Sequence, residues 1–323
     1  MATVVYSIES CIQHFFNQTT ATRAECDAMA ASLVGEPVNP VPVQGMWSYT
    51  VIAGPDQADI VQFRAEPSKL NMANVDIAML VHQTCVPRCT YHGMIGGRSP
   101  LYIYVMEKRN GACYIQARDM SKEGKFEFET RQLRTVGDLA RFFAEAWKSP
   151  QQVPLTFVNN LRRDLETDLN RLHQQLPNRF KDALNQVLKH LPRIFNMPFV
   201  ITHGDLNEMN ILVDDSGYIT GVIDWAESEF CPFGISLWAL ENILGHMDAM
   251  GWHYHDNSKE LREEFWRVFE ISIGPLQGVL HERYGQARKV NQQAARGSEM
   301  TNAQAMLAQK HRLKKSPRRG ARR

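Results

Sequence analysis

The stretch PFVITHGDLNEMNILVDDSGYITGVIDWAESEFCPFG, residues 198–234, determines how the fold is interpreted. It begins with an apolar segment that leads into His-Gly-Asp, whose last residue is Asp205. Asn210 follows five residues later, and Asp224 follows the last of the apolar segments, within Ile-Asp-Trp. A lone Asp or Asn at such a spacing is common by chance, but the fixed order of apolar segments and polar residues is specific.

The segment between Asn210 and Asp224 is predicted to form a β-hairpin. Two apolar runs, Ile211–Val213 and Tyr218–Ile223, are separated by Asp-Asp-Ser-Gly, which has the composition of a tight turn. The ends farthest from the turn then lie side by side, and these ends carry Asn210 and Asp224. An aspartate behind a strand is, taken alone, more often a helix cap, but the whole combination favours a site.

This arrangement suits phosphoryl transfer, in which an enzyme mainly positions the reactants and neutralises charge. Asp205 on a tight loop is the candidate catalytic base, because its carboxylate can accept the proton of an attacking hydroxyl group. Asn210 and Asp224 are the candidate metal ligands, since Mg²⁺ prefers hard oxygen ligands together with phosphates. Protein kinases have the same order: His-Arg-Asp, an Asn five residues on, and Asp-Phe-Gly.

These residues, and the run IDWAESEFCPFGISLWALEN at 223–242, resemble the aminoglycoside phosphotransferase and choline kinase-like superfamily, which has a protein kinase-like fold. The run is most similar to fungal members of the phosphotransferase enzyme family. The resemblance covers about residues 40–290 and is most specific over 199–245. It implies the three roles given above, with ATP and Mg²⁺ as cofactors. It names no acceptor among antibiotics, choline, sugars and other small hydroxyl compounds.

The expected fold class is α+β, a two-lobed protein kinase-like fold with a small mixed sheet lobe and a larger helical lobe. Three domains are expected: a nucleotide-binding lobe with leading helices at 1–106, a helical lobe with the catalytic hairpin at 107–300, and a basic disordered tail at 301–323. ATP is expected in the cleft between the lobes, against a hinge at Met106-Glu107-Lys108.

Periodicity and turn residues predict the main elements. Helices are expected within residues 1–36, with a capping box at Thr22 and Glu25, and at Leu70–Thr84, from a cap at Thr135 to Pro150, at 161–176, at 180–191, at about 234–245 and at 258–271. Strands are expected at Val41–Ile52, Asp59–Arg64, Tyr91–Ile95 and Leu101–Met106.

The residues expected to hold ATP depart from the usual kinase pattern. Gly45 and the Ser48 hydroxyl are candidates for phosphate contact, although Gly-x-Gly-x-x-Gly is absent and an ordinary turn fits equally well. Arg64 stands where kinases have a strand Lys, and it supplies the charge with a forked geometry. Asp76 is the acid available to pair with Arg64 on the following helix. Met106 is expected beside the nucleotide.

Two other function classes fit parts of the sequence. A non-catalytic pseudokinase that binds nucleotide or a protein partner is favoured by Arg64 and by the thin glycine loop, and opposed by the intact catalytic and metal-ligand candidates. A protein kinase is opposed by the absence of Asp-Phe-Gly and Ala-Pro-Glu motifs and of room for an activation loop after Asp224. The sequence therefore favours a small-molecule kinase with an alcohol-group acceptor, with natural-product metabolism as one setting.

Length and composition bound the remaining possibilities. The 323 residues are 44% hydrophobic, which suffices for two lobes with a core. No apolar run approaches the roughly 20 residues that cross a bilayer, and the first residues lack the basic region of a signal peptide, so we expect a cytoplasmic protein without a membrane partner.

Residues 310–323 hold eight Lys or Arg among fourteen residues and no acid. Such a run is compatible with a nuclear location or with nucleic-acid binding. We interpret it as a solvated tail and expect no nucleic-acid partner. The oligomeric state is left open.

The six cysteines have no disulfide spacing. One cluster has the residue types of a zinc site, namely His82, Cys85, Cys89 and His92. A Val-Pro step splits it, so we do not expect the four side chains to converge on one ion. A second, looser cluster contains His246, His253, His255 and Asp256. Either it lines a pocket or it lies in a surface loop, and we favour the loop.

Overall fold

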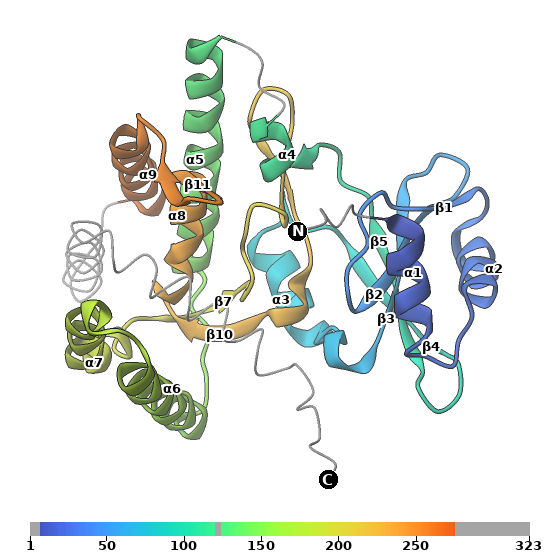
Figure 1. The fold of residues 1–323 in the computed structure, drawn as a ribbon, viewed down its shortest axis with the longest axis horizontal. Helices are drawn as coiled ribbons and strands as arrows, with labels where there is room; N and C mark the ends of the chain where they lie inside the picture. Colours follow the sequence, from blue (N-terminus) through green and yellow to red (C-terminus); the bar gives the residue numbers. More distant parts are fainter. Residues whose placement is uncertain (1–6, 120–123, 275–323) are drawn as a thin grey trace. The chain divides into compact units, whose positions relative to one another are not determined.

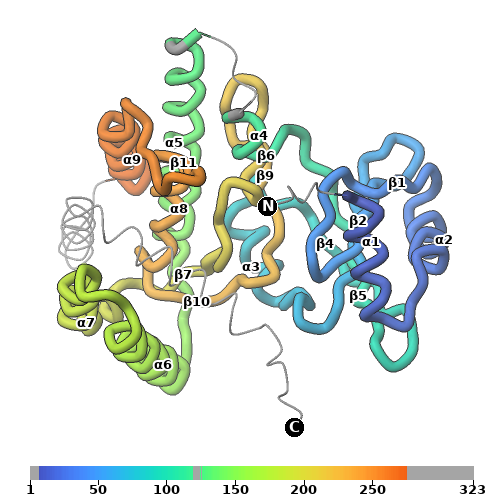
Figure 2. The backbone as a smooth tube through the Cα atoms, in the orientation of Figure 1, coloured from blue at the N-terminus to red at the C-terminus, as the bar shows by residue number. Residues whose placement is uncertain are grey.

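The computed structural model describes residues 7–119 and 124–274 (Figure 1). The described residues form two compact units, one of residues 7–111 with 220–227 and one of residues 112–119, 124–219 and 228–274. The first unit contains the largest sheet and the second contains the longest helices (Figure 2). The sequence-based division at residue 106 stays a prediction, and the basic tail lies outside the described residues.

The first unit is built on a five-stranded antiparallel sheet. Its strand order is β1-β2-β3-β5-β4, with these bounds: β1 Val38–Pro40, β2 Ser48–Ala53, β3 Asp59–Arg64, β4 Cys89–Ile95 and β5 Leu101–Glu107. In the middle strand, Arg64 pairs with Ser48 of β2 and with Tyr102 of β5. The expected strands at 59–64, 91–95 and 101–106 are confirmed, with small shifts at two of the ends.

The expected strand at Val41–Ile52 is wrong in its first half. A loop of residues 41–47 separates β1 from β2. The buried side chain of Gln44 closes this loop, since its Nε2 donates to the carbonyl oxygens of Val41 (3.1 Å) and Thr50 (2.8 Å) and its Oε1 accepts from the Thr50 amide (2.9 Å). One side-chain amide can donate and accept at once, so it replaces strand pairing here.

Two helices, α1 (Ile8–Phe16) and α2 (Arg23–Val34), pack against the sheet (Figure 1). Thr22 and Glu25 form the expected capping box at the start of α2: the Thr22 hydroxyl accepts from the Glu25 amide, and the Glu25 carboxylate accepts from the Thr22 amide. Gly35 ends the helix with a φ of 93°. The helical expectation for this region therefore holds for the described part.

Side chains alternate along β3, so its two faces differ in character. Val61 and Phe63 are fully buried in the core beneath α1 and α2. Gln62 and Arg64 belong to the opposite face, where they line a pocket together with Val75 of α3 (Met72–Val81). The polar face of β3 is the one that concerns the site.

Helices form most of the second unit. Their bounds are α4 Tyr114–Asp119, α5 Lys125–Lys148, α6 Leu155–Gln175, α7 Lys181–Ile194, α8 Trp238–Ile243 and α9 Ser258–Ile273. α5 packs on α9 through aromatic rings, with ring centroids 5.9 Å apart for Phe143 and Phe265 and 6.3 Å apart for Trp147 and Phe269. α6 and α7 form a separate pair around four leucines, Leu169, Leu172, Leu184 and Leu191 (Figure 1).

The helix expected to start with a cap at Thr135 is wrong at its start, because α5 begins at Lys125. Thr135 lies inside the helix, and its hydroxyl donates to the Gly217 carbonyl oxygen at 2.7 Å. Gly217 has a φ of 88°, and a Cβ there would lie 2.6 Å from the carbonyl oxygen of Arg131. A turn of the second unit therefore packs directly on α5.

That turn belongs to the expected hairpin, which is confirmed as β8 (Ile211–Val213) and β9 (Ile219–Val222) in a sheet of order β6-β8-β9. The Asp214 amide donates to the Tyr218 carbonyl oxygen at 3.0 Å and closes the turn. β6 (Ala112–Cys113) pairs with β8 antiparallel. β7 and β10 form a further antiparallel pair, with bounds Phe199–Thr202 and Glu229–Pro232.

The expected helix at about 234–245 is wrong at both ends. A 3-10 turn at Ile235–Leu237 precedes the short α8. The chain then forms a hairpin of β11 (Gly245–Asp248) and β12 (Gly251–Tyr254), which the sequence does not suggest. The histidine cluster therefore lies in part on this hairpin, with His246 opposite His253.

A small antiparallel sheet and a larger helical part confirm the expected α+β class. Over the described ranges, no helix is both long enough and apolar enough to span a membrane.

Candidate active site

The loop between β7 and β8 carries Asp205 and is closed by its own groups. Gly204 has a φ of 78°, a left-handed conformation that favours glycine and turns the chain sharply. Nδ1 of the buried His203 accepts from the Asp205 amide (3.3 Å). The Asn207 amide donates to the Asp205 carbonyl oxygen (2.9 Å), and the Asn210 amide donates to the Asn207 carbonyl oxygen (3.0 Å). The result is a compact turn that fixes the orientation of Asp205.

The Asp205 carboxylate is held by two side-chain amides of the same loop. Asn207 Nδ2 donates to Oδ1 at 3.0 Å. Asn210 Nδ2 donates to the Asp205 carbonyl oxygen at 2.7 Å and lies 3.3 Å from Oδ2. Two side-chain amides of the same loop thus orient the Asp205 carboxylate.

Asn210 offers an acceptor that fits a cation. Its nitrogen must be the atom directed at Asp205, because a carboxylate and a carbonyl group offer only acceptors. Its Oδ1 is then directed elsewhere, and no hydrogen bond engages that oxygen within the part of the chain that the structure describes. A largely buried amide oxygen of this kind suits a hard cation such as Mg²⁺.

Asp224, in the first unit, faces a positive charge. Its Oδ1 forms an ion pair with Nη2 of Arg64. Asp224 has a φ of 65°, which is uncommon for a residue with a side chain although less so for Asp. The next residue, Trp225, is buried and donates from Nε1 to the Val222 carbonyl oxygen at 2.9 Å. This local turn directs the carboxylate toward β3.

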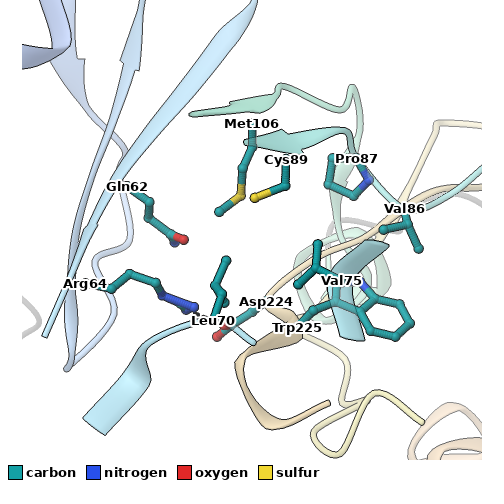
Figure 3. Close-up of a pocket in the computed structure, with 10 residues that line it drawn as sticks. All are labelled: Gln62, Arg64, Leu70, Val75, Val86, Pro87, Cys89, Met106, Asp224 and Trp225. Atoms are coloured by element: carbon teal, nitrogen blue, oxygen red, sulfur yellow. Dashed lines mark hydrogen bonds and ion pairs between the residues drawn. The ribbon is translucent and has the colours of Figure 1, made fainter. Parts of the chain in front are cut away.

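Arg64 is a buried cation with unused donors. The residue is 3% exposed, and its Nε and Nη1 have no hydrogen-bond partner among the described residues. Figure 3 shows its guanidinium group directed at Asp224, at one end of a pocket. Buried polar groups are nearly always paired, so this guanidinium group has the properties of an anion-binding group.

The rest of the pocket is mainly apolar. Besides Arg64 and Asp224 it is lined by Gln62, Leu70, Val75, Val86, Pro87, Cys89, Met106 and Trp225 (Figure 3). Burial raises the pKa of the Cys89 thiol to about 12, so this thiol stays neutral and is not a nucleophile. Met106 also lines this pocket, and its expected role toward a nucleotide stays a prediction.

The expected partner of Arg64 differs from the observed one. Asp76 forms no ion pair with Arg64 within the described residues, where the partner is Asp224. The reason is tertiary: the shorter Asp side chain on α3 is replaced by a carboxylate that a turn brings up to β3. The only sign in the sequence that Asp76 would not pair with Arg64 is that an Asp side chain is one methylene group shorter than a Glu side chain.

Gly45 and Ser48 lie close together at the end of the loop before β2. A Cβ on Gly45 would lie 2.8 Å from the Ser48 hydroxyl oxygen, so a side chain at position 45 would require that hydroxyl group to move. The role of this pair toward phosphate stays a prediction.

Neither histidine cluster forms a metal site: no three His, Cys, Asp or Glu side chains of residues 7–119 and 124–274 gather around one point. His246 instead stacks between its neighbours, with ring centroids 5.5 Å from His253 and 5.7 Å from His255. Burial, with His246 and Arg118 nearby, lowers the pKa of His255 to about 4. His255 is therefore neutral at pH 7.

Sequence reasoning missed two polar groups that shape the site. Gln44 closes the glycine loop, and Arg118 of α4 forms an ion pair with Glu208 in the Asp205 loop at 2.7 Å. A Gln beside a glycine loop and a Glu within a catalytic loop are weak signals, because surface positions carry both types freely.

The site and fold define a class of phosphotransferase. Residues 55–267 match the phosphotransferase enzyme family, and the chain belongs to this family. The match runs from before β3 through the Asp205 loop into α9. It confirms the resemblance to the aminoglycoside phosphotransferase and choline kinase-like superfamily and the expected class of enzyme.

Two solved structures have a similar fold. The macrolide 2′-phosphotransferase MphH from Brachybacterium faecium matches with a TM-score of 0.52 and 14% identity, over 93% of this chain and 98% of that chain. The Plasmodium vivax ethanolamine kinase matches with a TM-score of 0.51 and 12% identity, over 85% of this chain and 81% of that chain. No curated protein sequence matches the chain.

Proposed function

We propose that the chain transfers the γ-phosphoryl group of ATP, in a Mg²⁺-dependent reaction, to a hydroxyl group of a small molecule. The observation that carries this proposal is the buried Arg64 guanidinium group, two of whose nitrogens lack a partner among the described residues. Asp224 already supplies a counter-charge, and the two buried donors that remain require further hydrogen-bond acceptors. Nucleotide phosphates are anions whose oxygens match the forked guanidinium group.

The residues have separate proposed tasks. Asp205 accepts the proton of the acceptor hydroxyl group, while Asn210 and Asp224 hold the metal, which when bound neutralises phosphate charge. Arg64 binds phosphate oxygens, and Gly45, Ser48, Asp76 and Met106 are the further residues proposed to contact or support the nucleotide. For Asp76 the argument comes from the sequence alone.

The proposed reaction balances around Asp205. The acceptor oxygen forms a bond to the γ-phosphorus atom as the bond from that phosphorus to the bridging oxygen of ADP breaks, and the hydroxyl proton passes to the Asp205 carboxylate. Two amide donors already orient this carboxylate. Orientation of this kind contributes to rate because it removes the need to order the base during the reaction.

Natural-product alcohols and amino alcohols are the acceptors we would test first. The relatives with a similar fold are, by name, a macrolide phosphotransferase and an ethanolamine kinase. A natural-product pathway is the proposed setting. No residue described above selects one acceptor over another.

The alternative is a pseudokinase that binds a nucleotide or a protein partner without transfer. It is favoured by the Arg at position 64, which supplies a fork where a Lys supplies a point charge. It shares every prediction about nucleotide binding with the enzyme, so only turnover separates the two functions.

Asp205→Asn is the test, because it preserves the shape of the side chain and removes its charge. We expect MgATP binding by calorimetry to persist and ADP release, with a panel of hydroxyl compounds or with water alone, to fall by roughly 10²–10⁴-fold, the usual span for a positioned acid–base group. Asp215→Asn, on the exposed turn of the hairpin, is the matched control and should leave both quantities unchanged.

The decisive contrary result is a wild type that binds MgATP but releases ADP no faster than Asp205→Asn with every compound and with none. The pseudokinase would then replace the kinase as the proposed function.

A further inference from the structure

The catalytic loop is held from outside by the short helix α4. The Ile115 amide donates to the Glu208 carbonyl oxygen at 3.2 Å, and Arg118 Nη1 donates to Glu208 Oε1 at 2.7 Å. Glu208 lies between Asp205 and Asn210 in the loop. The two charged side chains are 11% and 19% exposed, so their ion pair is screened by solvent far less than a surface pair.

α4 is in turn attached to the end of α8 and the start of β11. With six residues α4 is too short to be stable alone. The buried Tyr114 donates from its hydroxyl to the Ile243 carbonyl oxygen at 3.4 Å, and Arg118 Nη1 lies 3.4 Å from the Gly245 carbonyl oxygen. Arg118 thus joins the catalytic loop to the segment where α8 gives way to the β11–β12 hairpin.

The hydrogen bonds within the loop set its shape, and its contacts with α4 connect it to another element. The hydrogen bonds among Asp205, Asn207 and Asn210 connect the loop to itself. The Arg118–Glu208 pair connects it to a helix 90 residues away in the sequence. A displacement of about 1 Å in a reacting group can lower a rate by about 100-fold, so the external connection has kinetic weight.

We propose that Arg118 is a positioning residue for phosphoryl transfer, which acts through its ion pair with Glu208 to fix where the Asp205 loop presents its carboxylate. The inference rests on the proposed function. Arg118 is not a catalytic residue, because its effect is transmitted by Glu208.

Arg118→Met tests the proposal, since Met keeps most of the length of the side chain and removes the charge. Hydrogen exchange of the Asn207, Met209 and Asn210 amides should become roughly 10- to 100-fold faster, the range for loss of a hydrogen bond between charged groups. The kcat per folded molecule should fall by roughly 10- to 100-fold. The nucleotide affinity, measured by calorimetry, should stay the same.

Matched variants separate positioning from general stability. Arg162→Met removes the exposed pair with Glu166 on α6 (3.0 Å) and should leave exchange in the loop and kcat unchanged. Glu208→Gln should reproduce part of the effect of Arg118→Met without a large change in volume. Arg118→Lys should recover part of the kcat. The double variant Arg118→Met/Glu208→Gln should be no slower than Arg118→Met, because both changes remove one interaction.

Three results would overturn the inference. The first is unchanged exchange of the loop amides in a folded Arg118→Met. The second is faster exchange with an unchanged kcat, or with a loss of nucleotide affinity as large as the loss of kcat, since either would mean a structural role only. The third is a wild type that releases no ADP, in which case the proposed function fails as well. An active wild type distinguishes the first two results from the third.

Discussion

Asp205 and Asp224 both lie just beyond a strand, yet the two units hold them in different ways. Asp205 receives side-chain N–H groups from Asn207 and Asn210, which lie two and five residues further along the chain. Asp224 faces the guanidinium group of Arg64, which lies 160 residues away in the sequence. The Asp205 carboxylate accepts hydrogen bonds from neutral side chains of its own loop. The Asp224 carboxylate contacts a buried charged side chain that is distant in the sequence.

The difference separates two kinds of work. Neutral amides fix the direction of a carboxylate and leave its charge available, which suits a group that receives a proton. A buried cation beside a carboxylate with a side chain 43% exposed forms a charged pair that a charged ligand can rearrange. The local arrangement is therefore expected to govern turnover, and the long-range arrangement to govern binding.

The largest expected effect in the binding region is at Asp224. Asp224→Asn should lower Mg²⁺-dependent ADP release by more than about 100-fold, because the loss of a direct ligand exceeds the 10- to 100-fold cost of losing an outer-shell group. Stabilisation by MgATP in a thermal-shift titration should fall in parallel. Asn210→Ala should have a smaller effect, since an amide oxygen is a weaker ligand than a carboxylate.

Asp215→Asn serves as the matched control for Asp224→Asn. The unfolding temperature without ligand must also be compared, because the variant removes the charge that faces Arg64. A folded Asp224→Asn that MgATP stabilises as much as the wild type would count against the assignment of Asp224 to the metal.

The next effect concerns Arg64 itself. Arg64→Ala should lower nucleotide affinity by about 10- to 150-fold, which corresponds to about 1.5–3 kcal/mol for a hydrogen bond to a charged group. Arg64→Lys should recover only part of the affinity, because the fork is lost. Calorimetry with MgATP measures both. Arg88→Ala is the control, because the Arg88 side chain is 87% exposed and its ion pair with Glu107 is long, at 3.6 Å. Wild-type affinity in Arg64→Ala would contradict the assignment of Arg64 to the nucleotide site.

The smallest expected effect is at His255, which lies near Arg118 in the second unit. The folded-state pKa of His255 is about 4, below its usual value of about 6.5. Between these values the unfolded chain binds a proton that the folded chain does not, so this contribution to stability is lost as the pH falls from about 6.5 to about 4. His246, Arg118 and Asp256 are the titratable and charged groups that act on His255.

His255→Gln should therefore reduce the loss of stability between pH 7 and pH 5, by an amount on the order of 1 kcal/mol once solvent screening is allowed for. Chemical denaturation at both pH values measures it. His173→Gln, on α6, is the control and should keep the acid sensitivity of the wild type. An unchanged acid sensitivity in His255→Gln would show that His255 is not buried as a neutral group.

The parts of the site that depend on nearby residues are predictable from the sequence. The strand β3 has the bounds that its residue pattern predicts, Asp59–Arg64. The compact loop at Asp205 follows from a glycine at a left-handed position and from side chains that can reach back over two to five residues. Such contacts need no knowledge of the rest of the fold.

The contacts between distant segments are not predictable in the same way. The pairing of Arg64 with Asp224 in place of Asp76, and that of Arg118 with Glu208, depend on which elements pack together. The prediction of where α5 starts fails for the same reason. Thr135 has the residue type of a cap, but its hydroxyl group donates a hydrogen bond to a turn that packs on the helix. Tertiary contacts override local preference at all of these positions.

The turn that packs on α5 also limits how the protein can be labelled. Turns between strands are usually the places where a chain accepts an inserted tag or fluorophore. Between β8 and β9 this option is closed, because Arg134 Nη1 donates to the Ser216 carbonyl oxygen at 2.9 Å and the backbone of Arg131 fills the space beside Gly217. The turn between β11 and β12 is the better choice, since Met250 there is 87% exposed. A reporter at that position would follow the β11–β12 hairpin next to Arg118. It would leave the contact between the β8–β9 turn and α5 intact.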